Sequence, residues 1–190
     1  MNDLILAQYP EFKISDYVSA MSRKKDADKI KIADAIKRRL IQRYITPGEI
    51  KENKNGFNIM ANCCLLIETF ESFYRGWPKT SDGADTFCKF FNRVPEFNEF
   101  TGKDLPTQFY KNIRCGILHQ GEVMGGWRIR RDQNQKLNFS EKLIDANHFR
   151  NELKHVIEKY FDDLKSKDWN SYEWKMLERK MKSIIKNCKE

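Results

Sequence analysis

The sequence predicts an all-α fold, a bundle of four or five main helices. Over most of the 190 residues, apolar side chains recur three and four positions apart, which is the spacing of one face of an α-helix. The helix-breaking residues are few, 9 Gly and 5 Pro, and they fall mainly between the periodic stretches. With 40% apolar residues, a chain of this length buries a full core without a disulfide or a metal ion.

The first half of the chain predicts two long helices. Residues 26–45 form one amphipathic helix, which stops at Thr46-Pro47-Gly48. Its apolar stripe consists of Ala33, Ile36, Leu40 and Tyr44. Residues 57–75 form the next helix, and its first half is apolar almost all round. A helix of that kind is typical of the centre of a bundle.

The second half predicts shorter elements followed by two helices. Five phenylalanines between residues 84 and 105, interrupted by Pro95 and Gly102, indicate short helical turns packed under a loop. Pro106 opens a helix whose apolar face carries Phe109, Tyr110, Ile113 and Ile117. A small β-hairpin is predicted near 125–140, with one strand up to Arg130 and the other at Lys136–Phe139. Regular stripes then predict a helix from about Asp145 to Leu164 and a last amphipathic helix.

This pattern predicts three segments. Residues 1–25 form an N-terminal arm, residues 26–165 form the helical core, and residues 166–190 form a C-terminal amphipathic helix packed on that core.

Charge and composition exclude several classes of protein. The longest apolar run, Cys63 to Ile67, is five residues and too short to span a bilayer, and the first residues do not resemble a secretory signal. We therefore expect a cytoplasmic protein that does not enter a membrane. The five cysteines show no C-x-x-C spacing, which predicts buried reduced thiols and no metal site. The motifs of P-loop, dinucleotide-binding, serine hydrolase and zincin proteins are absent, and no cofactor is expected.

The three histidines differ in their position on the predicted helices. His148 and His155 lie opposite an apolar stripe, which indicates solvated side chains. His119 follows Arg114 by five residues near the end of a helix, off its apolar face. Histidine accepts a proton near neutral pH, and arginine binds phosphate oxygens through a planar fork. These two side chains form a plausible pair for phosphodiester chemistry.

The spacing of that pair sets a geometric condition. On a regular α-helix, residues five apart point about 140° away from each other and differ by about 7.5 Å in rise. Arg114 and His119 therefore meet only if the helix loosens near Gly116, or if a second subunit supplies one of them.

An all-α domain with this R-x4-H motif resembles the HEPN-like superfamily, helical bundles found in bacterial toxin, phage-defence and RNA-processing systems. The resemblance covers roughly residues 26–165. It implies a metal-independent endoribonuclease of a bacterial defence or toxin–antitoxin type. His119 would assist attack by the ribose 2′-hydroxyl, and Arg114 would stabilise the phosphate in the transition state. The resemblance also implies a homodimer with the site at its interface, and an antitoxin or other protein as partner.

Two alternatives remain open for this segment. Active members usually carry a polar residue, often Asn, after the arginine, whereas this chain has Cys115. A non-catalytic HEPN-like module that binds RNA, a nucleotide or a protein partner is therefore the alternative function. In a purely structural role, Arg114 would bridge to Glu68 or Glu71, and His119 would cap a helix end or bond a backbone carbonyl.

Two basic segments are candidates for nucleic-acid binding. The net charge is +8, and residues 21–55 hold eleven Lys and Arg against five Asp and Glu. Within them, the candidates for phosphate contact are Lys37, Arg38 and Arg39. Interleaved acidic residues also fit an ordinary solvated helix face. On the predicted hairpin, Trp127 beside Arg128, Arg130 and Arg131 suits RNA contact, or else anchors the hairpin to the bundle.

Overall fold

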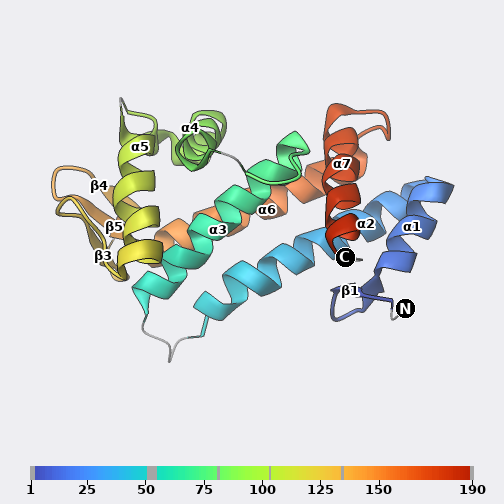
Figure 1. Ribbon diagram of the computed structural model, residues 1–190, viewed down its shortest axis with the longest axis horizontal. Helices are drawn as coiled ribbons and strands as arrows, with labels where there is room; N and C mark the ends of the chain where they lie inside the picture. The colour runs from blue at the N-terminus through green and yellow to red at the C-terminus, as the bar shows by residue number, and fades with distance from the viewer. Residues whose placement is uncertain (1–2, 51–54, 81, 103, 134, 189–190) are drawn as a thin grey trace. The chain divides into compact units, whose positions relative to one another are not determined.

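The computed structural model describes residues 3–50, 55–80, 82–102, 104–133 and 135–188 (Figure 1). These residues form two compact units. The first consists of Met1–Arg43, Ser72–Lys79 and Ile157–Glu190, and the second of Tyr44–Glu71 and Thr80–Val156. The units are mostly helical with small sheets, in agreement with the predicted all-α class at that coarse level. Their boundaries do not coincide with the segments 1–25, 26–165 and 166–190 expected from the sequence.

The first unit begins with a folded N-terminal segment. Strands β1 (Ile5–Ala7) and β2 (Phe12–Lys13) pair antiparallel, and α1 (Ile14–Arg23) follows directly. Leu6, Phe12 and Tyr17 are buried, so this segment contributes to a core.

The helices α2 (Asp26–Leu40) and α7 (Tyr172–Asn187) supply most of the rest of this core, together with the second half of α6 (Ala146–Ser166). The predicted stripe is confirmed for Ala33, Ile36 and Leu40, which are at most 2% exposed. Its fourth member, Tyr44, lies beyond α2 and is half-buried. The helix continues into a π-helical turn, η1 (Ile41–Ile45), and a 3₁₀ turn, η2 (Thr46–Gly48), at the predicted stop.

The second unit is built around the first part of α3 (Gly56–Arg75) and the first part of α6. Short helical turns were predicted over residues 84–105. The first part of this range instead forms an 11-residue helix, α4 (Gly83–Arg93), and the 3₁₀ helix η3 (Pro95–Phe100) follows it. Asp82 caps α4 by accepting a hydrogen bond from the backbone N–H of Asp85.

Aromatic side chains fill the core of this unit. The rings of Phe91 and Phe100 stack with centroids 4.9 Å apart, and Phe109 stacks on Phe149 at 5.5 Å. All five phenylalanines between residues 84 and 105 are at most 1% exposed. They serve packing and present no surface for stacking on bases: Phe87, Phe90, Phe91, Phe97 and Phe100.

The predicted β-hairpin near 125–140 is wrong in its pairing. Strands β3 (Arg128–Arg130) and β4 (Leu137–Asn138) do not pair with each other. Both pair with a third strand, β5 (Leu143–Asp145), parallel to β3 and antiparallel to β4. All three residues of β5 are buried, so the most apolar strand takes the centre of the sheet.

The exposure of the histidines and cysteines tests two further predictions. His148 and His155 are exposed on α6, as expected. Cys63 and Cys64 are buried, but Cys188 is exposed, so the expectation of buried thiols does not hold for every cysteine. Among the described residues, no helix is long and apolar enough to cross a bilayer.

Candidate functional site

The segment that carries Arg114 and His119 is not a regular α-helix. A single α-helical turn, α5 (Leu105–Phe109), leads into two π-helical turns, η4 (Tyr110–Arg114) and η5 (Gly116–Gln120). In a π-helix each N–H bonds the carbonyl five residues earlier, so side chains five apart lie one above the other. The helix therefore loosens around Gly116, which is the condition that the spacing of Arg114 and His119 required.

The two side chains contact each other within one chain. Nη1 of Arg114 lies 3.2 Å from Nε2 of His119. Because a guanidinium has only donors, Arg114 donates this hydrogen bond and the imidazole accepts it. The His119 side chain is exposed to solvent.

Glu68 on α3 holds the guanidinium from the other side. Nε of Arg114 donates to Oε1 of Glu68 at 2.9 Å, and Nη2 donates to Oε2 at 3.4 Å. The two side chains are only 18% and 13% exposed, so solvent screens this pair weakly. Burial lowers and the Glu68 carboxylate raises the pKa of Arg114, and the net shift is upward. Arg114 is therefore a fixed cation.

Tyr110 lies beneath this cation. The guanidinium carbon of Arg114 is 5.6 Å from the centre of the Tyr110 ring, a cation–π distance. Burial and a hydrogen bond with Cys115 raise the pKa of the Tyr110 hydroxyl, while Arg114 opposes the shift. Tyr110 is packed so closely on Gly83 of α4 that a Cβ at Gly83 would lie 2.3 Å from the ring.

The loop after the π-helical turns packs on Gly116. A Cβ at this position would lie 2.5 Å from the carbonyl oxygen of Glu122, a backbone atom that cannot swing away. The Gly116 carbonyl accepts hydrogen bonds from the N–H groups of Gly121 and Glu122. The N–H of Met124 donates to the Asn112 carbonyl at 2.9 Å, which further closes the loop on the turn. Gly116 thus allows the wide helix and the loop to pack together.

Part of this arrangement was predictable from the sequence. The alternatives had Arg114 either acting with His119 or bridging to Glu68 or Glu71. The structure shows the contacts with His119 and Glu68 at once, whereas Glu71 pairs with Arg93. The roles of Tyr110 and Gly83 were missed, because Tyr110 was assigned to the apolar face of the helix. Gly83 and Tyr110 belong to different helices and meet only in the folded chain, so no local sequence pattern indicates their contact.

The basic residues of α2 are engaged within the first unit. Lys37 pairs with Asp34 at 3.4 Å and with Asp162 at 2.8 Å. Arg38 donates to the carbonyl of Pro10 at 3.3 Å, and Arg39 donates to the carbonyl of Leu6 at 2.7 Å. In this conformation all three bind the chain's own carboxylates or N-terminal backbone.

The candidates on the small sheet differ in exposure. Trp127 is only 3% exposed and its ring lies 6.4 Å from that of Phe139, so Trp127 anchors the sheet. Arg128 is exposed and pairs with Glu141 at 3.6 Å. Arg130 is exposed at the end of β3. Of the three, the two arginines are accessible to a ligand.

Within the described residues there is no group of three or more His, Cys, Asp or Glu side chains arranged to hold a metal ion. Comparison with protein-family models, curated proteins and solved structures found no match to this chain.

Proposed function

We propose that this protein is a HEPN-like endoribonuclease that cleaves RNA without a metal ion, with Arg114 and His119 as its catalytic residues. The observation that supports it best is the 3.2 Å contact between the Arg114 guanidinium and Nε2 of an exposed His119. A fixed cation and an unprotonated imidazole nitrogen stand side by side, which are the two groups needed for attack on a phosphodiester.

The proposed reaction uses the 2′-hydroxyl of the substrate as nucleophile. Arg114 releases Nε2 of His119 as it turns to the phosphate. His119 then takes the 2′-hydroxyl proton on Nε2 while the 2′-oxygen forms a bond to phosphorus. The bond from phosphorus to the 5′-oxygen breaks, and that oxygen receives a proton from an imidazolium or from water. The products are a 2′,3′-cyclic phosphate and a 5′-hydroxyl. Arg114 faces the charge that develops on the phosphate oxygens, and Glu68 positions Arg114 through two hydrogen bonds.

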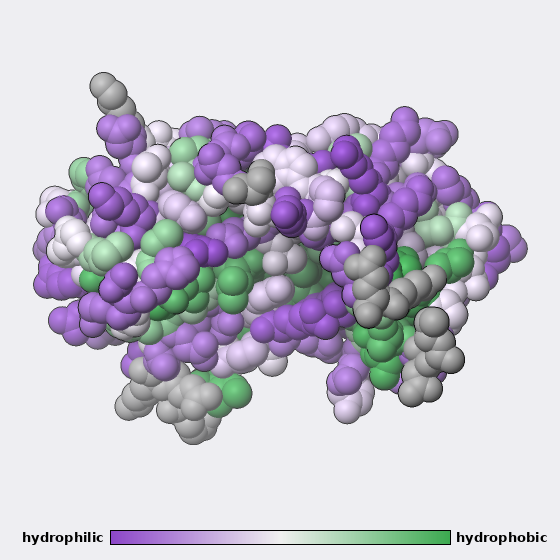
Figure 2. Space-filling model, viewed as in Figure 1, coloured by the Kyte–Doolittle hydropathy of each residue, from purple (hydrophilic) through white to green (hydrophobic). Residues whose placement is uncertain are grey.

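The proposal includes a homodimer with this site at its interface. Two apolar side chains near the site are exposed: Leu65, one turn before Glu68 on α3, is 37% exposed, and Leu118, next to His119, is 38% exposed. Figure 2 shows hydrophobic surface beside the first half of α3. A second copy that covers this surface would bring a second His119 to the site. Sedimentation of wild type against Leu65→Asp and Leu118→Asp tests it, and an unchanged monomer in all three would contradict it.

Cleavage of RNA in EDTA tests the catalytic proposal. We expect wild type to leave 2′,3′-cyclic phosphate ends, and His119→Ala and Arg114→Ala to lose cleavage by about 100-fold or more. His155→Ala is the matched control, because His155 is exposed on α6 away from this segment, and it should cleave as wild type does. Circular dichroism checks that each variant is folded. Cleavage that persists in folded His119→Ala would overturn the assignment.

A second candidate is a non-catalytic HEPN-like module of a bacterial defence or toxin–antitoxin system, which binds RNA or a protein such as an antitoxin. It is favoured by the two-point pairing of Arg114 with Glu68, since that carboxylate already occupies the fork a phosphate would use. This candidate predicts no cleavage by any variant. RNA binding that weakens steeply with salt would then identify an RNA-binding module.

A further inference from the structure

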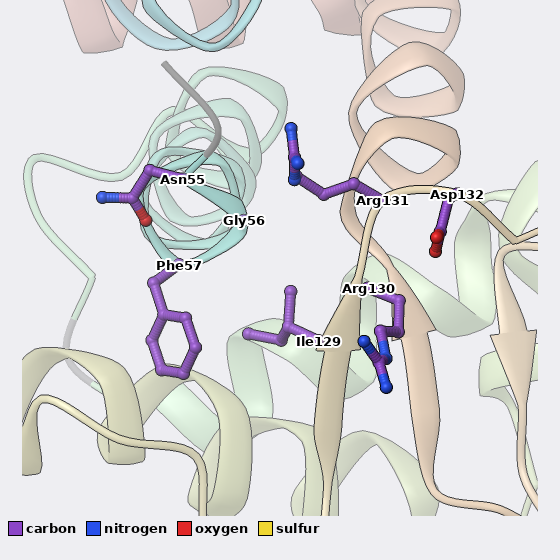
Figure 3. Close-up of a pocket in the computed structure, with 7 residues that line it drawn as sticks. All are labelled: Asn55, Gly56, Phe57, Ile129, Arg130, Arg131 and Asp132. Carbon is purple, nitrogen blue, oxygen red and sulfur yellow. The ribbon is translucent and has the colours of Figure 1, made fainter. Parts of the chain in front are cut away.

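The second unit carries two adjoining cavities that share one arginine and that the proposed ribonuclease chemistry does not use. One cavity of about 360 Å³ lies between the start of α3 and the end of β3, and its walls include Asn55, Ile129 and Arg131. The other, of about 320 Å³, lies between the η2 turn and the start of α6, and its walls include Gly48, Arg131 and Arg150. Figure 3 shows Arg131 and Ile129 pointing toward Asn55 and Gly56 at the start of α3.

The two arginines of the second cavity keep their full charge. No carboxylate of the described residues lies within ion-pair distance of Arg131 or Arg150, and Arg131 is half-buried. The Arg150 guanidinium donates instead to neutral acceptors, the Gly48 carbonyl and Oδ1 of Asn151 at 2.9 Å. Neutral acceptors orient a guanidinium without cancelling its charge, so the cavity is positive.

The acidic residues that line the two cavities have other partners. Glu49 pairs with Lys154 at 2.8 Å, and Asp132 accepts a hydrogen bond from Nε2 of Gln133 at 2.8 Å. The hydrogen bond from Gln133 and the charge of Arg130 lower the pKa of Asp132, so it stays ionised beside Arg130. Neither carboxylate neutralises Arg131 or Arg150.

Two glycines lie beside the stems of these arginines. A Cβ at Gly56 would lie 2.8 Å from Ile129 and 3.4 Å from the Cγ of Arg131. A Cβ at Gly48 would lie 3.1 Å from Ile59 and 3.4 Å from the Cδ of Arg150. The backbone of Arg131 is also fixed, because its carbonyl accepts a hydrogen bond from Nδ2 of Asn147 at 2.7 Å. The Arg150 guanidinium and the stem of Arg131 are thus placed before any ligand arrives, which lowers the entropy cost of binding.

We propose that these cavities bind a phosphate monoester, with its phosphate between Arg131 and Arg150. Two guanidinium groups that no described carboxylate pairs with match a group that carries about two negative charges at pH 7 and three acceptor oxygens. A phosphodiester or a carboxylate carries one charge and matches them less well. The start of the 20-residue helix α3 adds positive potential at the first cavity. The organic part of the ligand would lie in that cavity, against Ile129 and the Asn55 amide.

Titration calorimetry at 150 mM NaCl tests this site with inorganic phosphate and with phenyl phosphate. We expect both to bind wild type, and phenyl phosphate to bind more tightly because it also fills the first cavity. Arg131→Gln and Arg150→Gln should each weaken binding by about tenfold or more, the effect of losing one charged hydrogen-bonding group. Arg179→Gln, a substitution of an exposed arginine on α7, removes the same charge elsewhere and should bind as wild type does.

Several outcomes would overturn the proposal. They are the absence of binding by either probe, and binding that Arg131→Gln and Arg150→Gln leave unchanged. Binding of phosphate but not of phenyl phosphate would overturn the ester and leave an inorganic anion. If a glutamine variant does not fold, Arg131→Lys and Arg150→Lys keep the charge, and they should still weaken binding through the lost planar fork. His119→Ala should bind both probes normally, so failure here and failure of the ribonuclease proposal are separable.

Discussion

Arg114 and His119 are five residues apart, yet Nη1 of one lies 3.2 Å from Nε2 of the other across π-helical geometry. An α-helix would point them in different directions. π-Helical turns are rare in proteins, and they frequently occur at functional sites. Three neighbours hold the arrangement in place: Glu68 on α3, Tyr110 below the guanidinium and Gly116 under the following loop.

Gly116→Ala should destabilise the protein, because the new Cβ would meet the Glu122 carbonyl oxygen at 2.5 Å. Forcing a methyl group into packed backbone typically costs about 1–3 kcal/mol. Urea unfolding monitored by circular dichroism measures the loss. Gly102→Ala is the matched control, because the nearest atom to its Cβ would lie at 3.9 Å, and the free energy of unfolding should not fall. Equal stability of the two variants would show that Gly116 is not needed for the close packing.

Glu68→Gln should lower the free energy of unfolding by about 1–3 kcal/mol, because it leaves the guanidinium of a largely buried Arg114 without its counter-charge. Glutamine keeps the size of the side chain and one acceptor oxygen, so packing is preserved. The control is Glu158→Gln on α6, where no described ion pair is lost. A loss no larger than that of the control would contradict a structural role for the pair. If Glu68 positions Arg114 for catalysis, the same variant should also reduce the rate of RNA cleavage.

Arg39→Ala should loosen the N-terminal segment, because Arg39 donates to the Leu6 carbonyl of β1 at 2.7 Å. A charged hydrogen bond of this kind contributes about 1.5–3 kcal/mol. Amide hydrogen exchange should speed up in β1 and β2, and Arg43→Ala, an exposed arginine just beyond α2, should leave it unchanged. Unaltered exchange together with weaker RNA binding in Arg39→Ala would instead favour a nucleic-acid role for this arginine.

Thiol labelling should follow burial. With a disulfide reagent at pH 8, the exposed Cys188 should react first, Cys88 and Cys115 more slowly, and Cys63 and Cys64 only when the protein unfolds. Cys188→Ser should remove the fast phase and no other. Labelling of more than two thiols in the folded Cys188→Ser protein would show that the core around Cys63 and Cys64 opens readily.

The free energy of unfolding should also fall at alkaline pH, because the buried Cys63 thiol resists ionisation. Burial raises the pKa of this thiol from 9.0 to about 12. The pKa of this thiol is higher in the folded than in the unfolded protein. Its contribution to the free energy of unfolding is therefore complete below pH 9 and is lost as the pH rises toward 12. Cys63→Ser does not ionise in this range, so its free energy of unfolding should decline less steeply between pH 9 and 12. Parallel pH profiles of wild type and this variant would contradict the prediction.

The helices that were easiest to predict are those with regular stripes. Those of α2, α3 and α6 were predicted within a few residues, because apolar side chains at helical spacing must face a core wherever it lies. The small sheet was not, because β3 and β4 both pair with β5 and the sequence indicated only the nearer partner. The N-terminal 25 residues were expected to be an arm, and the buried Leu6, Phe12 and Tyr17 contribute to a core instead.

Local pattern thus determined the helical class, the main helix boundaries, the exposure of His148 and His155 and the choice of Arg114 and His119 as candidates. It did so because periodicity and capping act over a few residues. The contact between Arg114 and His119, the pairing with Glu68 and the joining of Arg131 with Arg150 in one cavity required the folded chain. Each depends on π-helical turns or on segments far apart in sequence, whose packing is decided by the fit of whole elements and not by any local preference.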